Sequence, residues 1–200
     1  MTATIRDRLA AALATGSDAD LAAWASTGPA AVLVLRDELG GKATTEPARP
    51  VHPRVIIDNL SAAAAAIASA EPEAFLAAFA GPEWSSDSFV LVGLGRIDDG
   101  RATARLVDAT RSPSEFARMD AAIGLAGRPS EAVATALRRL LDDGQYLVRY
   151  HALASLATSG TPAALPDLLR FKPLTEIERT MRDDAVVRIS GRARGAMSTN

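Results

Sequence analysis

The amino-acid sequence predicts an all-α fold: an α-solenoid in which antiparallel helix pairs stack on one another behind an N-terminal helical cap. Two observations predict it. Leucines recur along the chain at a constant step of 31 residues, in two separate columns. Gly and Pro interrupt the chain at helix-length intervals, between stretches rich in Ala and Leu. A constant period of this length, with apolar residues kept in register, is the sequence pattern of a helical repeat array.

The two columns occupy the two helices of one repeating unit. They consist of Leu94, Leu125 and Leu156 in the first helices, and Leu106, Leu137 and Leu168 in the second. One further step back reaches Leu60 and Phe75, which indicates a weaker fourth unit over residues 60–80. The alternative is chance register in an Ala/Leu-rich chain, which would require two independent columns each to repeat three times.

Residues 1–40 are predicted to form the cap, with helices over residues 3–14, 18–26 and 29–39. An array of this kind needs an atypical terminal unit that shields its exposed core. Asp18 is expected to cap the second helix, and Trp24 in that helix is interpreted as covering the end of the core rather than contacting a ligand.

The rest of the chain divides into a loop, the repeats and a C-terminal segment. Residues 41–53 contain three prolines and no apolar period, so they are expected to form a loop with a solvated His52. Residues 54–171 carry the repeats. Residues 172–200 are expected to hold a cap helix or a truncated last repeat over 174–194, followed by a basic tail. All four parts are expected to form one structural domain.

Residues 142–170 are the clearest unit. Gly160 is expected to end the first helix in the left-handed conformation, and Thr161 to cap the second with Pro162 in its first position. The face that the first helix is predicted to bury holds Leu147, Tyr150, Leu153, Ala154 and Ala157. The apolar stripe of the second helix holds Leu165, Leu168 and Leu169.

This unit resembles the short HEAT-like repeat that occurs in many bacterial proteins. The matching residues are Asp142, Asp143, Val148, Arg149, Ala152, Leu156, Gly160, Ala164 and Leu168. The preceding unit matches at Arg118, Ala121, Ala122, Leu125, Gly127, Val133 and Leu137, with Ala117 in place of the valine. The resemblance covers residues 87–171. It implies a right-handed solenoid that serves as a protein-binding scaffold, because few members of the family are enzymes.

The composition of the chain argues against several classes of protein and kinds of site. The chain has 200 residues, a mass of 20.8 kDa and a net charge of −2 with a pI near 5.7, which argues against a protein devoted to binding nucleic acid. The absence of cysteine excludes disulfides and thiolate metal sites and is typical of a cytoplasmic protein. We expect no signal peptide and no membrane span, because charges break every long apolar run.

No combination of residues predicts catalysis, a cofactor or a metal site. The chain has two histidines, and His151 is interpreted as a buried or interface residue of its helix. Carboxylate pairs could suggest acid–base chemistry, but their expected place at the turns before helices indicates capping instead. These pairs are Asp98–Asp99, Asp142–Asp143 and Asp183–Asp184. The sequence therefore predicts a protein that is not an enzyme.

The candidate partner-binding residues lie on the second helices, which in this family usually line the binding face. The 31-residue step places Asp108, Arg139 and Arg170 in one column, with Arg138 beside it and Lys172 extending its end. The alternative interpretation of these residues is a solvated charged face.

Arg118 and Arg149 form a second column, on the first helices. The arginine at this position of the family commonly links neighbouring repeats, so a structural role is expected for both.

Three functional hypotheses remain. The leading one is a non-enzymatic module that binds a protein partner. The second is a nucleic-acid-binding protein similar to HEAT-like DNA glycosylases, which would use Arg138, Arg139, Arg170, Lys172, Arg188, Arg192 and Arg194. The third, a lyase-like chaperone for a chromophore or a modified protein, rests on the repeat resemblance alone.

Overall fold

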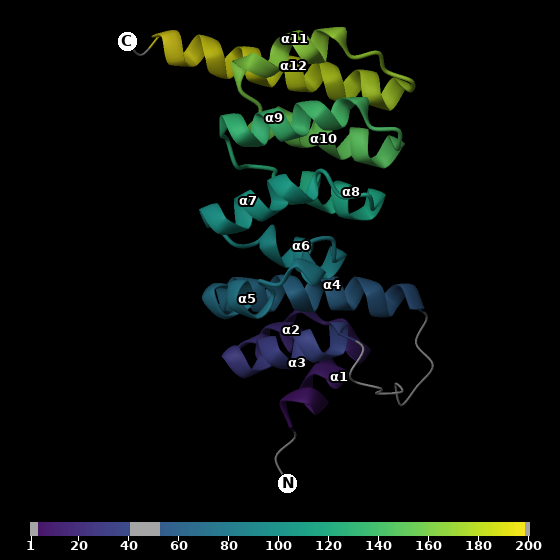
Figure 1. The fold of residues 1–200 in the computed structure, drawn as a ribbon, viewed down its shortest axis with the longest axis vertical. Helices are drawn as coiled ribbons and strands as arrows, with labels where there is room; N and C mark the ends of the chain where they lie inside the picture. The colour runs from purple at the N-terminus through teal and green to yellow at the C-terminus, as the bar shows by residue number, and fades with distance from the viewer. Residues whose placement is uncertain (1–3, 41–52, 199–200) are drawn as a thin grey trace. The chain divides into compact units, whose positions relative to one another are not determined.

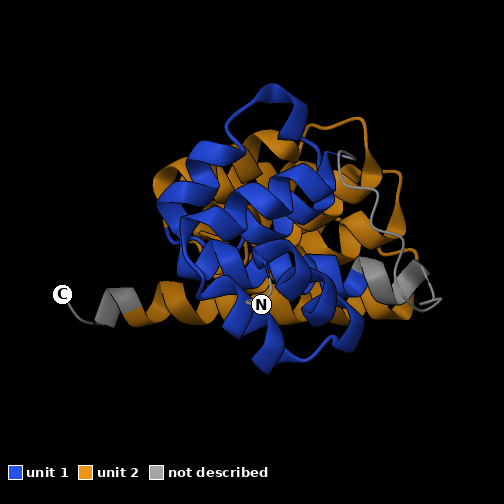
Figure 2. Ribbon diagram, turned by 90° about the horizontal axis from the view of Figure 1, so that it is seen from below, with its two compact units in different colours: residues 1–98 blue, residues 99–200 orange. Residues whose placement is uncertain are grey.

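The computed structural model describes residues 4–40 and 53–198. Over these residues the chain forms α-helices and short 3-10 turns and contains no strand, so the all-α prediction is confirmed. The chain divides into two compact units, Met1–Asp98 and Asp99–Asn200, which Figure 2 shows in blue and orange.

Most of the predicted loop lies outside the described residues, including His52. Pro53, the last residue of the predicted loop, is instead the first residue of a helix. The predicted division at residues 40, 53 and 171 stays a prediction.

Unit 1 is centred on its longest helix, α4, which contacts α1, α2, α3, α5 and α6. Trp24, Phe75 and Phe79 are among its largest fully buried side chains. The helices of unit 1 (Figure 1) are α1 (Ile5–Thr15), α2 (Asp18–Ala25), α3 (Pro29–Leu39), α4 (Pro53–Ala70), α5 (Pro72–Ala78) and α6 (Ser88–Leu94).

Local capping explains where the helices of unit 1 begin. The Thr4 hydroxyl accepts a hydrogen bond from the Asp7 N–H, and the Asp7 carboxylate accepts one from the Thr4 N–H, which caps α1. Gly16 ends α1 with a φ of 62°, in the left-handed region that favours glycine. The predicted cap of α2 is wrong by one residue, because the Ser17 hydroxyl caps the helix and Asp18 is its first residue.

Unit 2 consists of two layers of helices. The first helices α8, α10 and α12 form one layer, in which each contacts the next, and the second helices α7 and α9 contact each other in the other layer. The helices of unit 2 (Figure 1) are α7 (Gly100–Ala109), α8 (Glu115–Gly124), α9 (Glu131–Arg139), α10 (Tyr146–Ser159), α11 (Leu165–Arg170) and α12 (Glu176–Ser198).

The leucine columns form the core of the repeats, as their register predicts. Every leucine of both columns is fully buried: Leu94, Leu106, Leu125, Leu137, Leu156 and Leu168. The weaker fourth unit keeps one of its two positions in the core, because Phe75 is fully buried and Leu60 is only partly buried.

The predicted buried face of α10 is wrong in part. Leu147 is 52% exposed, and Tyr150 and Ala154 are only partly buried, whereas Val148 and Ala152 lie in the core. The physical reason is that α10 packs between α8 and α12 within its layer and also against α9. Since neighbours cover most of its circumference, one apolar stripe does not define its orientation.

Two details of the following turn also differ from expectation. Gly160 has φ −67° and ψ 140°, so it is extended rather than left-handed. A Cβ atom at Gly160 would lie 2.6 Å from Cδ1 of Ile189, so the glycine allows α12 to approach α10 closely. In α11, Leu168 is buried but Leu169 is 69% exposed, so Leu169 does not belong to the apolar stripe.

Thr161 was expected to cap the second helix of this unit, but its side chain makes no capping hydrogen bond, and a short 3-10 turn, Pro162–Ala164, precedes α11.

The C-terminal segment is one continuous helix, α12, rather than a truncated repeat with its own turn. Asp183 and Asp184 therefore lie in mid-helix, and their expected place at a turn is wrong. They pair with arginines of the same helix, Arg182 and Arg188, each at 2.7 Å. No Gly or Pro occurs between Leu174 and Ser190 that could have opened a turn there.

Candidate interaction groove

Unit 2 contains a groove of about 960 Å³, bounded by the C-terminal end of α9, the α9–α10 loop, and α11 with the residues that follow it. Four of the five residues predicted to contact a partner line it: Arg138, Arg139, Arg170 and Lys172. The lining also includes three aspartates and three apolar residues, which are Asp142, Asp143 and Asp167, and Leu141, Phe171 and Leu174.

The fifth predicted residue, Asp108, does not line the groove. Asp108 lies on the exposed surface of α7, and its carboxylate is 3.5 Å from the guanidinium of Arg111 in the next turn. The 31-residue column therefore brings Arg139 and Arg170 to one groove and leaves Asp108 outside it.

One carboxylate serves two of the groove's arginines. Asp167 accepts a hydrogen bond from Nε of Arg138 on one oxygen and from Nη2 of Arg170 on the other. These hydrogen bonds, first that of Arg138 and then that of Arg170, hold the pKa of Asp167 below its usual value, so the carboxylate stays ionised. Asp167 thus pairs with two positive charges, and Arg138 has a second, longer ion pair with Glu131 at 3.8 Å.

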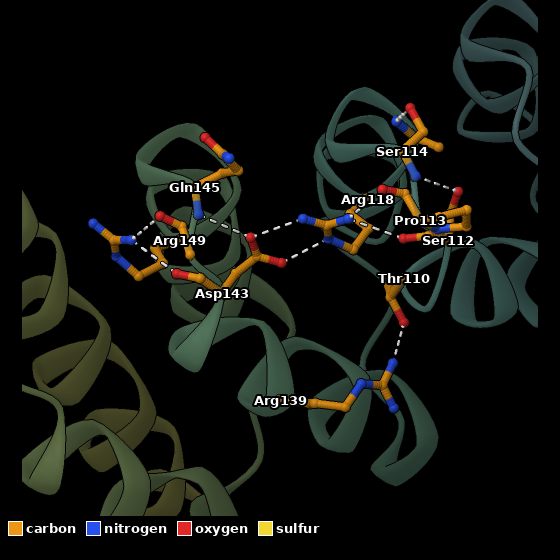
Figure 3. A network of polar contacts seen from close by, with 11 residues as sticks. Thr110, Ser112, Pro113, Ser114, Arg118, Arg139, Asp143, Gln145 and Arg149 are labelled. Carbon is orange, nitrogen blue, oxygen red and sulfur yellow. Dashed lines mark hydrogen bonds and ion pairs between the residues drawn. The ribbon is translucent and has the colours of Figure 1, made fainter.

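Arg139 is held by a neutral partner (Figure 3). Its Nη2 donates to the hydroxyl of Thr110 at 2.5 Å, and that buried hydroxyl donates to the carbonyl of Val107 at 2.6 Å. Within the part of the chain that the structure describes, no carboxylate lies within ion-pair distance of Arg139. Burial and the nearby positive charge of Arg111 lower the pKa of Arg139.

Lys172 is exposed, and no described residue pairs with its ammonium group. Lys172 and Arg139 are therefore the two cations of the groove whose charges no carboxylate compensates.

Behind the groove, Arg118 of α8 connects two repeats (Figure 3). Its Nε and Nη2 donate to the two oxygens of Asp143 at 2.6 and 3.0 Å, a bidentate pair. Its Nη1 donates to the carbonyls of Ser112 and Pro113 in the loop before α8. Burial acts to raise the pKa of Asp143, but the hydrogen bonds from Arg118 and from the Gln145 N–H outweigh it and lower that pKa.

Arg149 of α10 repeats this arrangement one unit later. Its Nη1 donates to the carbonyls of Asp143 and Gly144, which stand six and five residues before it, as Ser112 and Pro113 do for Arg118. Its Nε donates to Oε1 of Glu178 at 2.7 Å. The predicted role of both arginines as links between neighbouring repeats is confirmed by these bonds.

Glu178 is a structural residue that the sequence analysis missed. It is fully buried, and its Oε2 accepts hydrogen bonds from the N–H groups of Leu174 and Thr175 at 2.7 and 3.2 Å. The Thr175 hydroxyl in turn accepts from the Glu178 N–H at 3.1 Å. Thr-x-x-Glu before a helix is the capping-box pattern, so this signal was present in the sequence.

The arginines of α12 that the nucleic-acid hypothesis requires have local partners. Arg192 donates to the carbonyls of Ala157 and Gly160 at 2.8 and 2.9 Å, which holds α12 against the end of α10. Arg188 pairs with Asp184. Neither guanidinium lines the groove.

His151 is partly buried, and its ring meets the edge of Tyr150 at a centroid distance of 5.0 Å. Burial lowers the pKa of His151, which favours the neutral imidazole. Among the residues that the structure describes, no group of three or more His, Asp and Glu side chains is placed to bind a metal ion.

Comparison with protein families identifies the repeats. The family model for HEAT repeats matches residues 71–157 and 103–173, which together span a little over half of the chain. The chain belongs to the HEAT-repeat family. HEAT repeats are generally scaffolds for protein interactions. A comparison with curated proteins gives no match. None of the helices over residues 4–40 and 53–198 combines the length and hydropathy that a membrane crossing requires.

Proposed function

We propose that this HEAT-repeat protein is a non-enzymatic interaction module that holds a segment of a protein partner in the groove of unit 2. The observation that carries the proposal is the groove itself. It lies on the second helices, it has a volume of about 960 Å³, and it presents Arg138, Arg139, Arg170 and Lys172 together. Two of those cations have no carboxylate partner among the described residues, so a partner can compensate their charge without breaking an existing ion pair.

A binding role is supported over catalysis by what the polar side chains of the groove do. Asp143 and Arg149 are engaged in bonds between repeats, and Asp167 is held by two arginines. Catalysis by a nucleophile requires an adjacent base that a third group orients. His151 does not line the groove, and its ring contacts Tyr150.

A protein partner is favoured over nucleic acid by the mixed lining of the groove. Beside its cations the groove presents Leu141, Phe171 and Leu174, which apolar side chains of a protein can cover and a phosphate backbone cannot. A protein that binds a duplex through about 6–10 phosphate contacts needs a matching number of basic side chains. Arg188 and Arg192, which that role would also need, are engaged within α12 or with the end of α10. We further infer a cytoplasmic location from the absence of cysteine.

Affinity capture from the native lysate, with and without nuclease, tests the proposal. Arg138→Glu combined with Arg139→Glu should preserve helicity by circular dichroism and abolish capture of the protein that wild type enriches. The matched control is Arg179→Glu combined with Arg188→Glu, since both arginines are exposed on α12 and outside the groove. Equal capture by wild type and the groove variant would refute the site, and capture that disappears with nuclease would favour nucleic acid.

A further inference from the structure

The charges around the groove do not balance. Its lining holds five cations and three carboxylates, and three further residues, Arg118, Glu131 and Glu178, form ion pairs with lining residues. Six cations thus face five carboxylates. Two of the pairs are closed, Arg118 with Asp143 and Arg149 with Glu178, and the excess lies with the groups that face the open groove.

Arg139 is oriented for an external acceptor. Its contact with Thr110 uses one N–H, whereas a guanidinium carries five, and a hydroxyl does not neutralise its charge. Arg111, which pairs with Asp108 at 3.5 Å, stands close enough for its charge to repel that of Arg139, and Arg139 has no carboxylate partner among the described residues. An anion bound at Arg139 relieves this repulsion, and the side chain loses little entropy because Thr110 already holds it.

The groove also offers apolar contacts beside the cations. Leu174 is 77% exposed, the highest value among the large hydrophobic side chains that the structure describes as exposed, and it lines the groove together with Phe171 and Leu141. The backbone of Leu174 is held in place, because its N–H donates to buried Glu178 at 2.7 Å. An apolar side chain of a partner that covered Leu174 would gain about 25 cal/mol for each Å² of apolar surface removed from water.

We propose that the occupant of the groove is an acidic protein segment, whose Asp or Glu carboxylates bind Arg139 and Lys172 and whose apolar side chains contact Phe171 and Leu174. This inference rests on the proposed interaction function and adds the chemical class of the partner. A phosphate backbone fits less well, because it has no apolar side chain that could cover Leu174 and Phe171 beside the cations.

Fluorescence anisotropy with labelled short peptides tests this inference on the full chain. The probe is a peptide of repeated Asp-Glu-Leu, and the matched probe of repeated Asn-Gln-Leu has the same shape without charge. The acidic peptide should bind and the amide peptide should not, and added salt should weaken binding because exposed charges are screened. Arg139→Gln combined with Lys172→Gln should weaken binding about tenfold, the effect expected when rim charges are lost.

The control variant, Arg179→Gln combined with Arg188→Gln, should bind the acidic peptide as wild type does. Equal binding of the acidic and amide peptides, or equal binding by wild type and the groove variant, would overturn the inference. So would a single-stranded oligonucleotide that displaces the acidic peptide at lower concentration than unlabelled peptide does. If lysate capture still depends on Arg138 and Arg139 while the acidic peptide fails to bind, the interaction function stands and the acidic partner is refuted.

Discussion

The buried ion pair between Arg149 and Glu178 gives the sharpest test of how the repeats are held together. Glu178 is fully buried and Arg149 nearly so, and they come from neighbouring helices of one layer, α10 and α12. The substitution Arg149→Met keeps an unbranched apolar stem but ends before the guanidinium. It removes the guanidinium from Glu178 and from the carbonyls of Asp143 and Gly144.

Breaking a buried pair by removing one partner costs about 3–5 kcal/mol, because the other charge stays buried without compensation. The N–H groups of Leu174 and Thr175 still donate to Glu178 in the variant, so we expect the lower end, about 3 kcal/mol. In a protein of this size, each 1 kcal/mol lowers Tm by about 2–4 °C, so the expected fall in Tm is about 6–12 °C.

Urea unfolding followed by circular dichroism measures this loss, because Trp24 and Trp84 both lie in unit 1 and their fluorescence does not report on α10 and α12. Glu178→Gln keeps the capping pattern, and together with Arg149→Met it completes a double-mutant cycle. We expect a coupling energy of about 1–3 kcal/mol. The exposed pair of Arg179 with Glu176 provides the control, since Arg179→Met should cost less than about 1 kcal/mol. A cost of the same size for Arg149→Met, or additive costs in the cycle, would refute the reasoning.

Three other predictions follow from the structure. Leu156→Asp should unfold the repeats, because it buries a carboxylate without a partner. Leu169→Asp, on the exposed side of α11, should change the free energy of unfolding by no more than about 0.5 kcal/mol. Equal thermal melts of the two variants would contradict the predicted register. The folded-state pKa of Asp143 lies below 3.8, so its contribution to the free energy of unfolding should be present above pH 3.8 and disappear as the pH falls through that lower pKa. Urea unfolding at several pH values measures this loss, and Arg118→Met should reduce it. An unchanged pH dependence in the variant would show that Arg118 is not the cause. The His151 ring should titrate below 6.5 by NMR, because burial disfavours the imidazolium, and a value at or above 6.5 would show that the ring is solvated.

The repeat register was predictable because a solenoid core imposes the same requirement on every unit. Leu125 and Leu156 occupy one position of successive first helices, each must be buried, and only a constant step in sequence achieves this. The structural roles of Arg118 and Arg149 were also predictable, because the same residue type recurs at that step and the arginine at this position of the family commonly links neighbouring repeats.

The charge balance of the groove could not be predicted in the same way. Arg138 and Arg139 are adjacent in sequence, yet one meets the carboxylate of Asp167 and the other the hydroxyl of Thr110, directly after α7. Both partners stand 29 residues away, on opposite sides in sequence, so the compensation of each arginine depends on how neighbouring repeats stack. The exposure of Leu147 has a similar origin, because α10 has neighbours on several sides.

The arginine links described above have a direction. Each arginine donates hydrogen bonds to carbonyls of the loop before its own helix and to a carboxylate of the unit that follows. Position 180, one step of 31 beyond Arg149, is a threonine. The chain of links therefore stops at α12. Tandem duplication of residues 113–143 would supply one new arginine and one new aspartate in register, so the protein can lengthen by whole units within the array. Duplication of α12 would supply a second carboxylate, that of Glu178, but no arginine at the linking position, so the added helix would not be joined by the same kind of link.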